Sequence, residues 1–142
     1  VRMTASDILT SDRILIAPAL ATSNVAKLGE EAQAAVAAGA DCLHFNVMDG
    51  HHTEKLTWGP MMVKALRAYG VEAPIDVQLT CGKEIVDVQI EEFAAAGASY
   101  ITFHAEGTRN IDRSLGLIAS LGCKCGVVLN PSTPTSYREG TG

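Results

Sequence analysis

Polar and apolar side chains alternate in three short runs of the sequence, and the polar members carry groups that can do chemistry. They are His44 and Asn46, Asp76 and Gln78, and Thr102 and His104. Successive side chains of a β-strand point to opposite faces, so each run predicts a strand with one polar face. His104 and Glu106 share that parity, and an imidazole and a carboxylate there could work as an acid–base pair. We expect them instead to be hydrogen-bonded interior groups that support a site.

The cysteines predict no metal centre. Cys42, Cys81, Cys123 and Cys125 lack the spacing of a redox or zinc-finger motif. A soft-metal site at Cys123 and Cys125 would need two further ligands, which we cannot identify. We therefore predict reduced thiols, most of them packed in the interior.

A repeated unit of one strand and one helix must position the polar residues. Glycines that recur at intervals of 25 to 31 residues each have the sequence context of a helix end before a strand; they are Gly39, Gly70, Gly97 and Gly122. Apolar periodicity predicts helices after Asn24 and Asn110, which can cap them, and across residues 86–94. Strands are predicted at residues 14–17, 42–47, 75–79, 100–104 and 126–129.

Two architectures fit five such units. The length favours a flavodoxin-like five-stranded sheet, because a complete (β/α)₈ barrel normally needs about 200 residues or more. The alternating polar face argues the other way, since the central strands of a doubly wound sheet lie under helices on both faces and read as continuous apolar runs. We therefore predict an incomplete (β/α)₈ barrel with about five βα units.

Composition excludes several classes of protein. The chain has 142 residues, 47% apolar and 19% charged, which predicts one soluble globular domain. A formal net charge of −5 without a Lys/Arg cluster argues against nucleic acid as a partner. No run approaches the roughly 18 apolar residues of a membrane helix, and residues 1–12 are too polar for a secretory signal. We expect a cytoplasmic protein that does not bind membranes.

Several ungapped motifs resemble the ribulose-phosphate 3-epimerase family of (β/α)₈ barrels. The resemblance runs from about Ile14 to Pro134, so we expect residues 1–13 to be an N-terminal extension and 14–142 a partial barrel domain. Its most specific parts are the Met-Asp-Gly-His run at residues 48–51 and the Asn-Pro-Ser-Thr-Pro run at 130–134. It also includes the runs at residues 16–18, 27–31, 38–41, 56–60 and 102–106.

The resemblance implies an isomerase. Members of this family interconvert D-ribulose 5-phosphate and D-xylulose 5-phosphate by inverting the third carbon. They use a divalent metal (zinc, iron, manganese or cobalt) and two aspartates on opposite faces of the sugar. A carboxylate removes the weakly acidic proton beside the ketone, while the metal polarises the carbonyl and holds the enediolate.

The family's metal and base positions fall on changed residues here. The first metal histidine corresponds to His44, while Asn46 stands where the family has the aspartate that binds metal and takes the proton. Gln78 stands at the next metal histidine, which also contacts the substrate. An amide neither titrates near neutral pH nor carries the charge that holds a dication.

Other positions carried over from the family are substrate-contacting or supporting. Ala19 replaces a substrate-contacting serine and Thr80 replaces a methionine. Met48, His104 and Glu106 match supporting positions, and the resemblance gives Asp49 a role in shaping a loop.

The family continues through three more strands after the position of Pro134, and those strands carry the other catalytic aspartate and the phosphate-binding loops. We expect the open barrel edge to be covered by another copy or a partner chain. The favoured hypothesis is a metal-dependent epimerase with impaired activity. The alternatives are a catalytically silent homologue that acts as a binding or regulatory partner, and a truncated product with no stable role.

Overall fold

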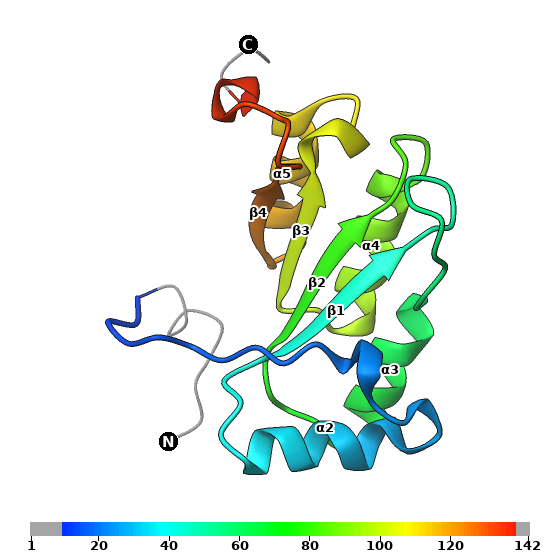
Figure 1. Cartoon of the computed structure of the whole chain (residues 1–142), viewed down its shortest axis with the longest axis vertical. Coiled ribbons are helices and arrows are strands. Elements are labelled where there is room, and N and C mark those ends of the chain that lie inside the picture. The colour runs from blue at the N-terminus through cyan, green and yellow to red at the C-terminus, as the bar shows by residue number, and fades with distance from the viewer. Residues whose placement is uncertain (1–9, 139–142) are drawn as a thin grey trace.

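Four parallel strands form the centre of the protein (Figure 1). The computed structural model describes residues 10–138. The strands lie side by side in chain order: β1 (Leu43–Met48), β2 (Ile75–Thr80), β3 (Tyr100–His104) and β4 (Lys124–Val128). They alternate with the helices α2 (Leu28–Ala37), α3 (Pro60–Tyr69), α4 (Val86–Ala96) and α5 (Ile111–Ser120). Short 3₁₀ turns occupy Leu20–Thr22, Val25–Lys27, Ala105–Gly107 and Thr135–Arg138.

The helices begin and end at residues that the sequence marks. Asn24 caps the 3₁₀ turn that leads into α2, and Asn110 caps α5; each side chain accepts a backbone N–H of the first turn. Gly70 and Gly97 follow α3 and α4 with φ of 101° and 110°. This is the left-handed region that glycine adopts without strain. The predicted caps and terminal glycines are therefore confirmed.

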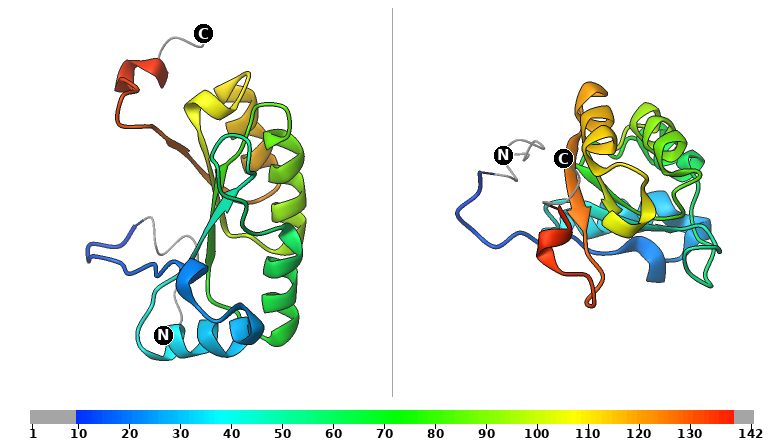
Figure 2. Two further views of the ribbon diagram at one scale, coloured as in Figure 1. Left: turned by 45° about the vertical axis from the view of Figure 1, so that its right-hand side comes forward. Right: turned by 90° about the horizontal axis from the view of Figure 1, so that it is seen from above.

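Across β1, β2 and β3, one face of the sheet is buried and the other is mostly half-buried. Side chains such as Phe45, Val77 and Phe103 are fully buried, whereas the alternate row that contains Asn46 and Gln78 is partly accessible. Figure 2 shows α3, α4 and α5 together on one side of the sheet. A flavodoxin-like sheet would have helices on both sides and a different strand order. The described residues therefore confirm a segment of a (β/α)₈ barrel.

The prediction of a fifth strand at residues 14–17 is wrong. The segment runs beside β1, where Ile16 O accepts from Asp41 N at 2.9 Å and Pro18 O accepts from His44 N at 2.9 Å, but its pairing is a single bridge between Ala19 and His44. Pro18 has no N–H to donate to a ladder. The Ile16 N–H is instead taken by the Asp41 carboxylate at 2.8 Å.

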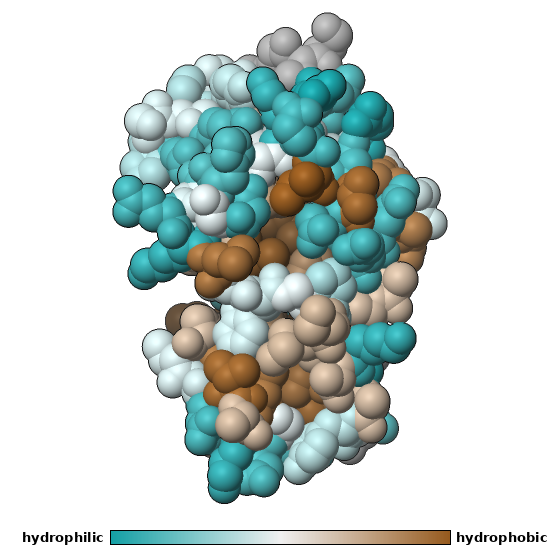
Figure 3. Space-filling view, turned by 90° about the vertical axis from the view of Figure 1, so that its right-hand side faces the viewer, coloured by the Kyte–Doolittle hydropathy of each residue, from teal (hydrophilic) through white to brown (hydrophobic). Residues whose placement is uncertain are grey.

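The molecule's surface is chemically mixed. Figure 3, seen from the side of α3, shows apolar areas between polar ones, and Leu56, Met61 and Val88 are among the exposed apolar residues. Within residues 10–138, no helix has the length and apolar character needed to cross a membrane. All four cysteines are free, and three are buried; burial raises the pKa of Cys42 to about 11 and that of Cys81 to about 12.

Arg67 ties together the loops at the amino ends of the strands. Its guanidinium donates to Gly97 O at 3.0 and 2.8 Å, to Val71 O at 2.8 Å and to Ala73 O at 2.7 Å. These carbonyls belong to the loops that follow α3 and α4 and lead into β2 and β3. One half-buried side chain therefore sets where two strands begin.

We predict that Arg67→Lys lowers the free energy of unfolding by about 1 to 3 kcal/mol, because an ammonium keeps the charge but cannot reach all three carbonyls, and buried acceptors are left unpaired. Urea unfolding followed by circular dichroism measures the change.

The matched control is Arg109→Lys, since Arg109 forms an ion pair with Glu84 in which both side chains are about 60% exposed. That substitution should change stability by no more than about 0.5 kcal/mol. Equal effects of the two substitutions would contradict the role assigned to Arg67.

Candidate functional site

The register of the sheet brings the predicted polar residues into adjacent positions. His44 on β1 pairs with Asp76 on β2, and Asn46 pairs with Gln78. Gln78 in turn pairs with Thr102 on β3. In (β/α)₈ barrels the carboxyl ends of the strands carry the functional groups. Asn46 and Gln78 lie in the second half of β1 and β2, and His44 and Asp76 lie in the first half.

His44 is held by a carboxylate. Its Nδ1 lies 2.7 Å from Asp76 Oδ2. An ionised carboxylate can only accept, so Nδ1 carries the proton and donates to it. This fixes the orientation of the ring and leaves Nε2 as its second polar atom.

Thr80 is the centre of a hydrogen-bond network that crosses three strands. Its hydroxyl donates to Asn46 Oδ1 at 2.9 Å. Thr80 Oγ1 also lies 3.3 Å from His104 Nε2. Gln78 Nε2 lies 3.4 Å from His104 Nε2 and 3.5 Å from Thr80 Oγ1. We name this set, Asn46, Gln78, Thr80 and His104, the strand-end network.

Glu106 connects the network to the segment after β4. Its Oε1 accepts from the backbone N of Asn130 at 3.2 Å and from the Thr133 hydroxyl, which explains why the Asn-Pro-Ser-Thr-Pro run has its place here. Its Oε2 lies 3.6 Å from His104 Nδ1. Neither of these two buried atoms has a hydrogen-bond partner among the described residues.

The charges of His104 and Glu106 suit a supporting role. Burial lowers the pKa of His104, and the nearby His52 lowers it further against the opposing effect of Glu106. Burial raises the pKa of Glu106, but hydrogen bonds from Thr133 and Asn130 outweigh it and leave the pKa below its usual value. An ionised Glu106 therefore faces an imidazole that favours its neutral form at pH 7.

Asp49 shapes the loops beyond β1 and β2. Its Oδ1 accepts from the backbone N of His51 at 2.9 Å and of His52 at 2.7 Å, and its Oδ2 accepts from Gly82 N at 2.8 Å. Burial raises the pKa of Asp49, but these three donors outweigh that effect and lower it. The carboxylate thus joins two loops, in agreement with its expected loop-shaping role.

The comparisons with known proteins agree with this geometry. The model of the ribulose-phosphate 3 epimerase family matches residues 15–141. The chain belongs to the ribulose-phosphate 3-epimerase family.

Its curated relatives include the ribulose-phosphate 3-epimerase of Escherichia coli strain K12, which is 54% identical over 125 residues, covering 88% of this chain and 55% of that protein. The Serratia marcescens protein of the same name is 50% identical over 127 residues, covering 89% and 60%. The chain therefore spans a little over half the length of these relatives. A crystal structure of mandelate oxidase superposes with a TM-score of 0.49 at 18% identity, over 77% of this chain and 42% of that one.

The residues of this epimerase-family chain do not fit a divalent metal at the strand-end network. Asn46 and Gln78 offer neutral amides, the Asn46 oxygen is engaged by Thr80, and His44 adds one imidazole. No group of three or more His, Cys, Asp or Glu side chains within residues 10–138 is arranged to hold a metal ion. A dication without a carboxylate ligand would lack the compensating charge that such sites use.

Sequence reasoning missed two neighbours of the site. The His52 ring lies 5.3 Å from the His104 ring, centroid to centroid. Thr57 accepts from Met48 N and donates to Asn46 O, both at 2.9 Å, which connects the loop back to β1. Strand parity could not predict either contact, because His52 and Thr57 both lie in the loop after β1.

The remaining predicted positions contribute little polar chemistry. Ala19 lies beside His44 through its backbone bridge, but its methyl group offers no hydrogen bond. Met48 pairs with Thr80 in the register of β1 and β2 and is half-buried.

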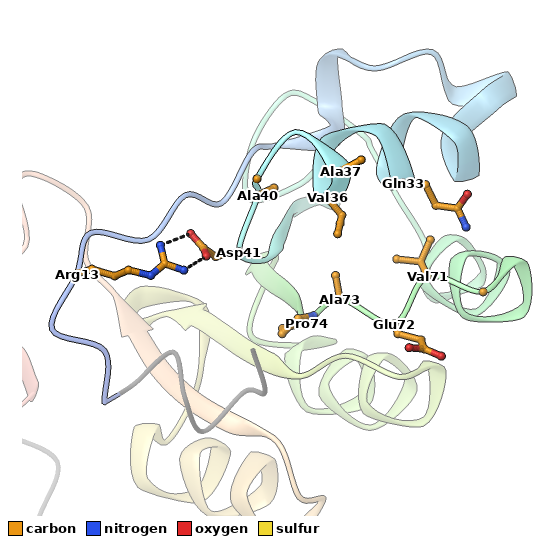
Figure 4. A pocket seen from close by; sticks show the side chains of 12 residues that line it. Arg13, Gln33, Val36, Ala37, Ala40, Asp41, Val71, Glu72, Ala73 and Pro74 are labelled. Atoms are coloured by element: carbon orange, nitrogen blue, oxygen red, sulfur yellow. Dashed lines mark hydrogen bonds and ion pairs between the residues drawn. The ribbon is translucent and has the colours of Figure 1, made fainter. Parts of the chain in front are cut away.

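Two cavities lie at opposite ends of the strands. One, of about 510 Å³, lies among the loops at the carboxyl ends and is lined by residues that include His51, His52, Lys83 and Glu106. The other, of about 520 Å³, lies at the amino ends between α2 and the loop before β2, next to the ion pair of Arg13 and Asp41 (Figure 4). Family chemistry belongs to the carboxyl ends, so the second cavity is not the candidate site.

We predict that Asp49→Asn lowers the free energy of unfolding by about 1 to 3 kcal/mol at neutral pH, because the new amide NH₂ faces the Gly82 N–H and the charge that three donors stabilise is lost. The lowered pKa means that the carboxylate stabilises the fold above its usual pKa, and that this contribution is lost as the pH falls through the lowered value.

The difference in urea midpoint between parent and variant should therefore be smaller at about pH 3 than at about pH 7. Glu54→Gln, in the same loop but exposed, serves as the control and should leave the midpoint unchanged at both values. A difference that persists at low pH would show that the Asp49 charge is not the stabilising feature.

Proposed function

We propose that this chain forms the first half of a ribulose-phosphate 3-epimerase barrel whose proton-transfer step is severely slowed. The substrate class is D-ribulose 5-phosphate and D-xylulose 5-phosphate. The observation that carries the proposal is the position of Asn46, in register with Gln78 and hydrogen-bonded to Thr80, where the family has its aspartate base.

The chemistry sets the size of the defect. Removing a proton beside a ketone needs a group whose pKa lies near the working pH, and an amide has none. His104 does not replace the base directly, since its Nε2 is turned toward Gln78 and Thr80. Loss of the general base lowers the rate by about 10² to 10⁴.

The proposal extends to the arrangement of the whole protein. Residues 14–142 form the barrel domain and residues 1–13 an extension, which the start of the family match at residue 15 supports. The remaining part of the barrel completes the sheet beyond β4, either within a longer polypeptide or from another copy or partner chain. We propose a cytoplasmic location in the pentose phosphate pathway for the assembled protein.

A catalytically silent homologue is the second candidate. The two amides at Asn46 and Gln78 favour it, because both replace groups that the family uses in its reaction. Such a protein would bind the sugar phosphate, or regulate a complete epimerase, without turning the sugar over.

We predict that Asn46→Asp with Gln78→His raises epimerase turnover by about 10² or more in a chimera in which this chain is followed by the second half of the Escherichia coli relative, because the pair restores a titratable base and a second imidazole. A coupled assay for xylulose 5-phosphate formation measures the change.

Asn24→Asp, an exposed cap that keeps its acceptor oxygen, is the matched control and should leave turnover unchanged. High turnover of the unsubstituted chimera would refute the proposed defect. Binding of the sugar phosphate with no turnover in the restored variant would favour the silent homologue.

A further inference from the structure

We propose that the strand-end network replaces the divalent cation of the family's site, so that this chain takes the hydroxyl and carbonyl groups of a sugar by direct hydrogen bonds without a metal. The inference rests on the proposed function for the identity of the sugar. The replacement of the cation follows from this chain's own contacts.

The amides of the network are not oriented to bind a cation. A cation needs lone pairs that point at it, and the Asn46 oxygen already accepts the Thr80 hydroxyl at 2.9 Å. Gln78 turns its NH₂ group toward His104 Nε2 and Thr80 Oγ1, so the donor end of that amide lies at the centre of the network. A donor in that position repels a cation.

The network also lacks the negative charge that a dication needs. Every member of the network is uncharged once His104 favours its neutral form. Asp76, on the same strand as Gln78, lies against His44 Nδ1 at 2.7 Å. A dication at the network would lose its water shell without gaining a carboxylate ligand there, which is strongly unfavourable.

Three polar side-chain atoms at the network and on the neighbouring His44 are left without a partner in the described part of the chain. Among residues 10–138, His44 Nε2, Asn46 Nδ2 and Gln78 Oε1 have no hydrogen-bond partner, and all three side chains are half-buried on the face opposite the helices. An NH₂ donor, a carbonyl acceptor and an imidazole nitrogen match the adjacent hydroxyl and carbonyl oxygens of a ketose. Such neutral groups orient a polyol ligand without any metal.

Thr80 is the residue that holds the network in this state. Within the described part of the chain, its hydroxyl is the one side-chain group that hydrogen-bonds with both Asn46 and His104. A side chain without a hydroxyl at this position would release the Asn46 oxygen, so Thr80 is a positioning residue for the amides.

The test of metal replacement is a titration of the 142-residue chain with cobalt(II), whose visible absorption reports its ligands. A His51→Asn, His52→Asn background removes the imidazoles of the neighbouring loop. We expect the parent chain to leave cobalt(II) with the spectrum of its aqua ion. Adding Asn46→Asp and Gln78→His should produce a new ligand-field band and at least tenfold tighter binding of cobalt(II). One equivalent of cobalt bound by the parent, and lost in His44→Ala, would overturn the inference.

The second measurement is sugar binding. Ribulose 5-phosphate is titrated by NMR in the presence of EDTA and again with zinc, and we expect dissociation constants within about twofold of each other, with Thr80→Val weakening both. Binding that requires zinc would overturn the inference. Absence of binding in both conditions would overturn the sugar assignment and the proposed function, while the cobalt titration would still decide whether a metal is held.

Cooperative thermal unfolding establishes that each sample is folded. If the chain alone does not unfold cooperatively, both titrations are made on the chimera with the second half of the Escherichia coli relative. There we expect tighter binding of the sugar phosphate, because the added half carries the phosphate-binding loops, but the same independence of zinc and the same effect of Asn46→Asp with Gln78→His on cobalt binding.

Discussion

The parallel register of β1, β2 and β3 is the constraint on which the rest of the structure depends. It pairs His44 with Asp76, Asn46 with Gln78 and Gln78 with Thr102, so that side chains from three strands meet in one row. Because strand side chains alternate between faces, a slip of one residue would turn this row toward the helices and send Phe45 and Val77 to the open face. The buried aromatic and aliphatic row therefore holds the polar row in place.

The loops beyond the strands are held by two carboxylates. Asp49 joins the loops after β1 and β2 through backbone N–H groups, and Glu106 joins the end of β3 to the segment after β4. Between them lies a network of neutral side chains centred on Thr80. Charged side chains thus hold the loops, and neutral side chains occupy the carboxyl ends of the strands.

Much of this could be predicted from the sequence, because it depends on local patterns. The caps at Asn24 and Asn110 and the terminal glycines follow from residue types that few other conformations favour, and strand parity gave the polar row. The strand predicted at residues 14–17 is not formed; the prediction rested on the apolar pattern alone and did not consider that Pro18 has no N–H to donate to a neighbouring strand. The role of Thr80 and the reach of Asp49 to Gly82 could not be predicted, since parity shows which face a side chain is on but not which partner it meets.

We propose that the carboxyl ends of these strands offer neither a base nor a metal site for the epimerase reaction. Proton NMR of ribulose 5-phosphate in deuterated water, with the folded protein and with or without zinc, tests it most directly. We expect deuterium incorporation at the third carbon to be about 10² to 10⁴ slower than in an ordinary epimerase reaction, with zinc making no difference. Rapid exchange that depends on zinc would contradict it.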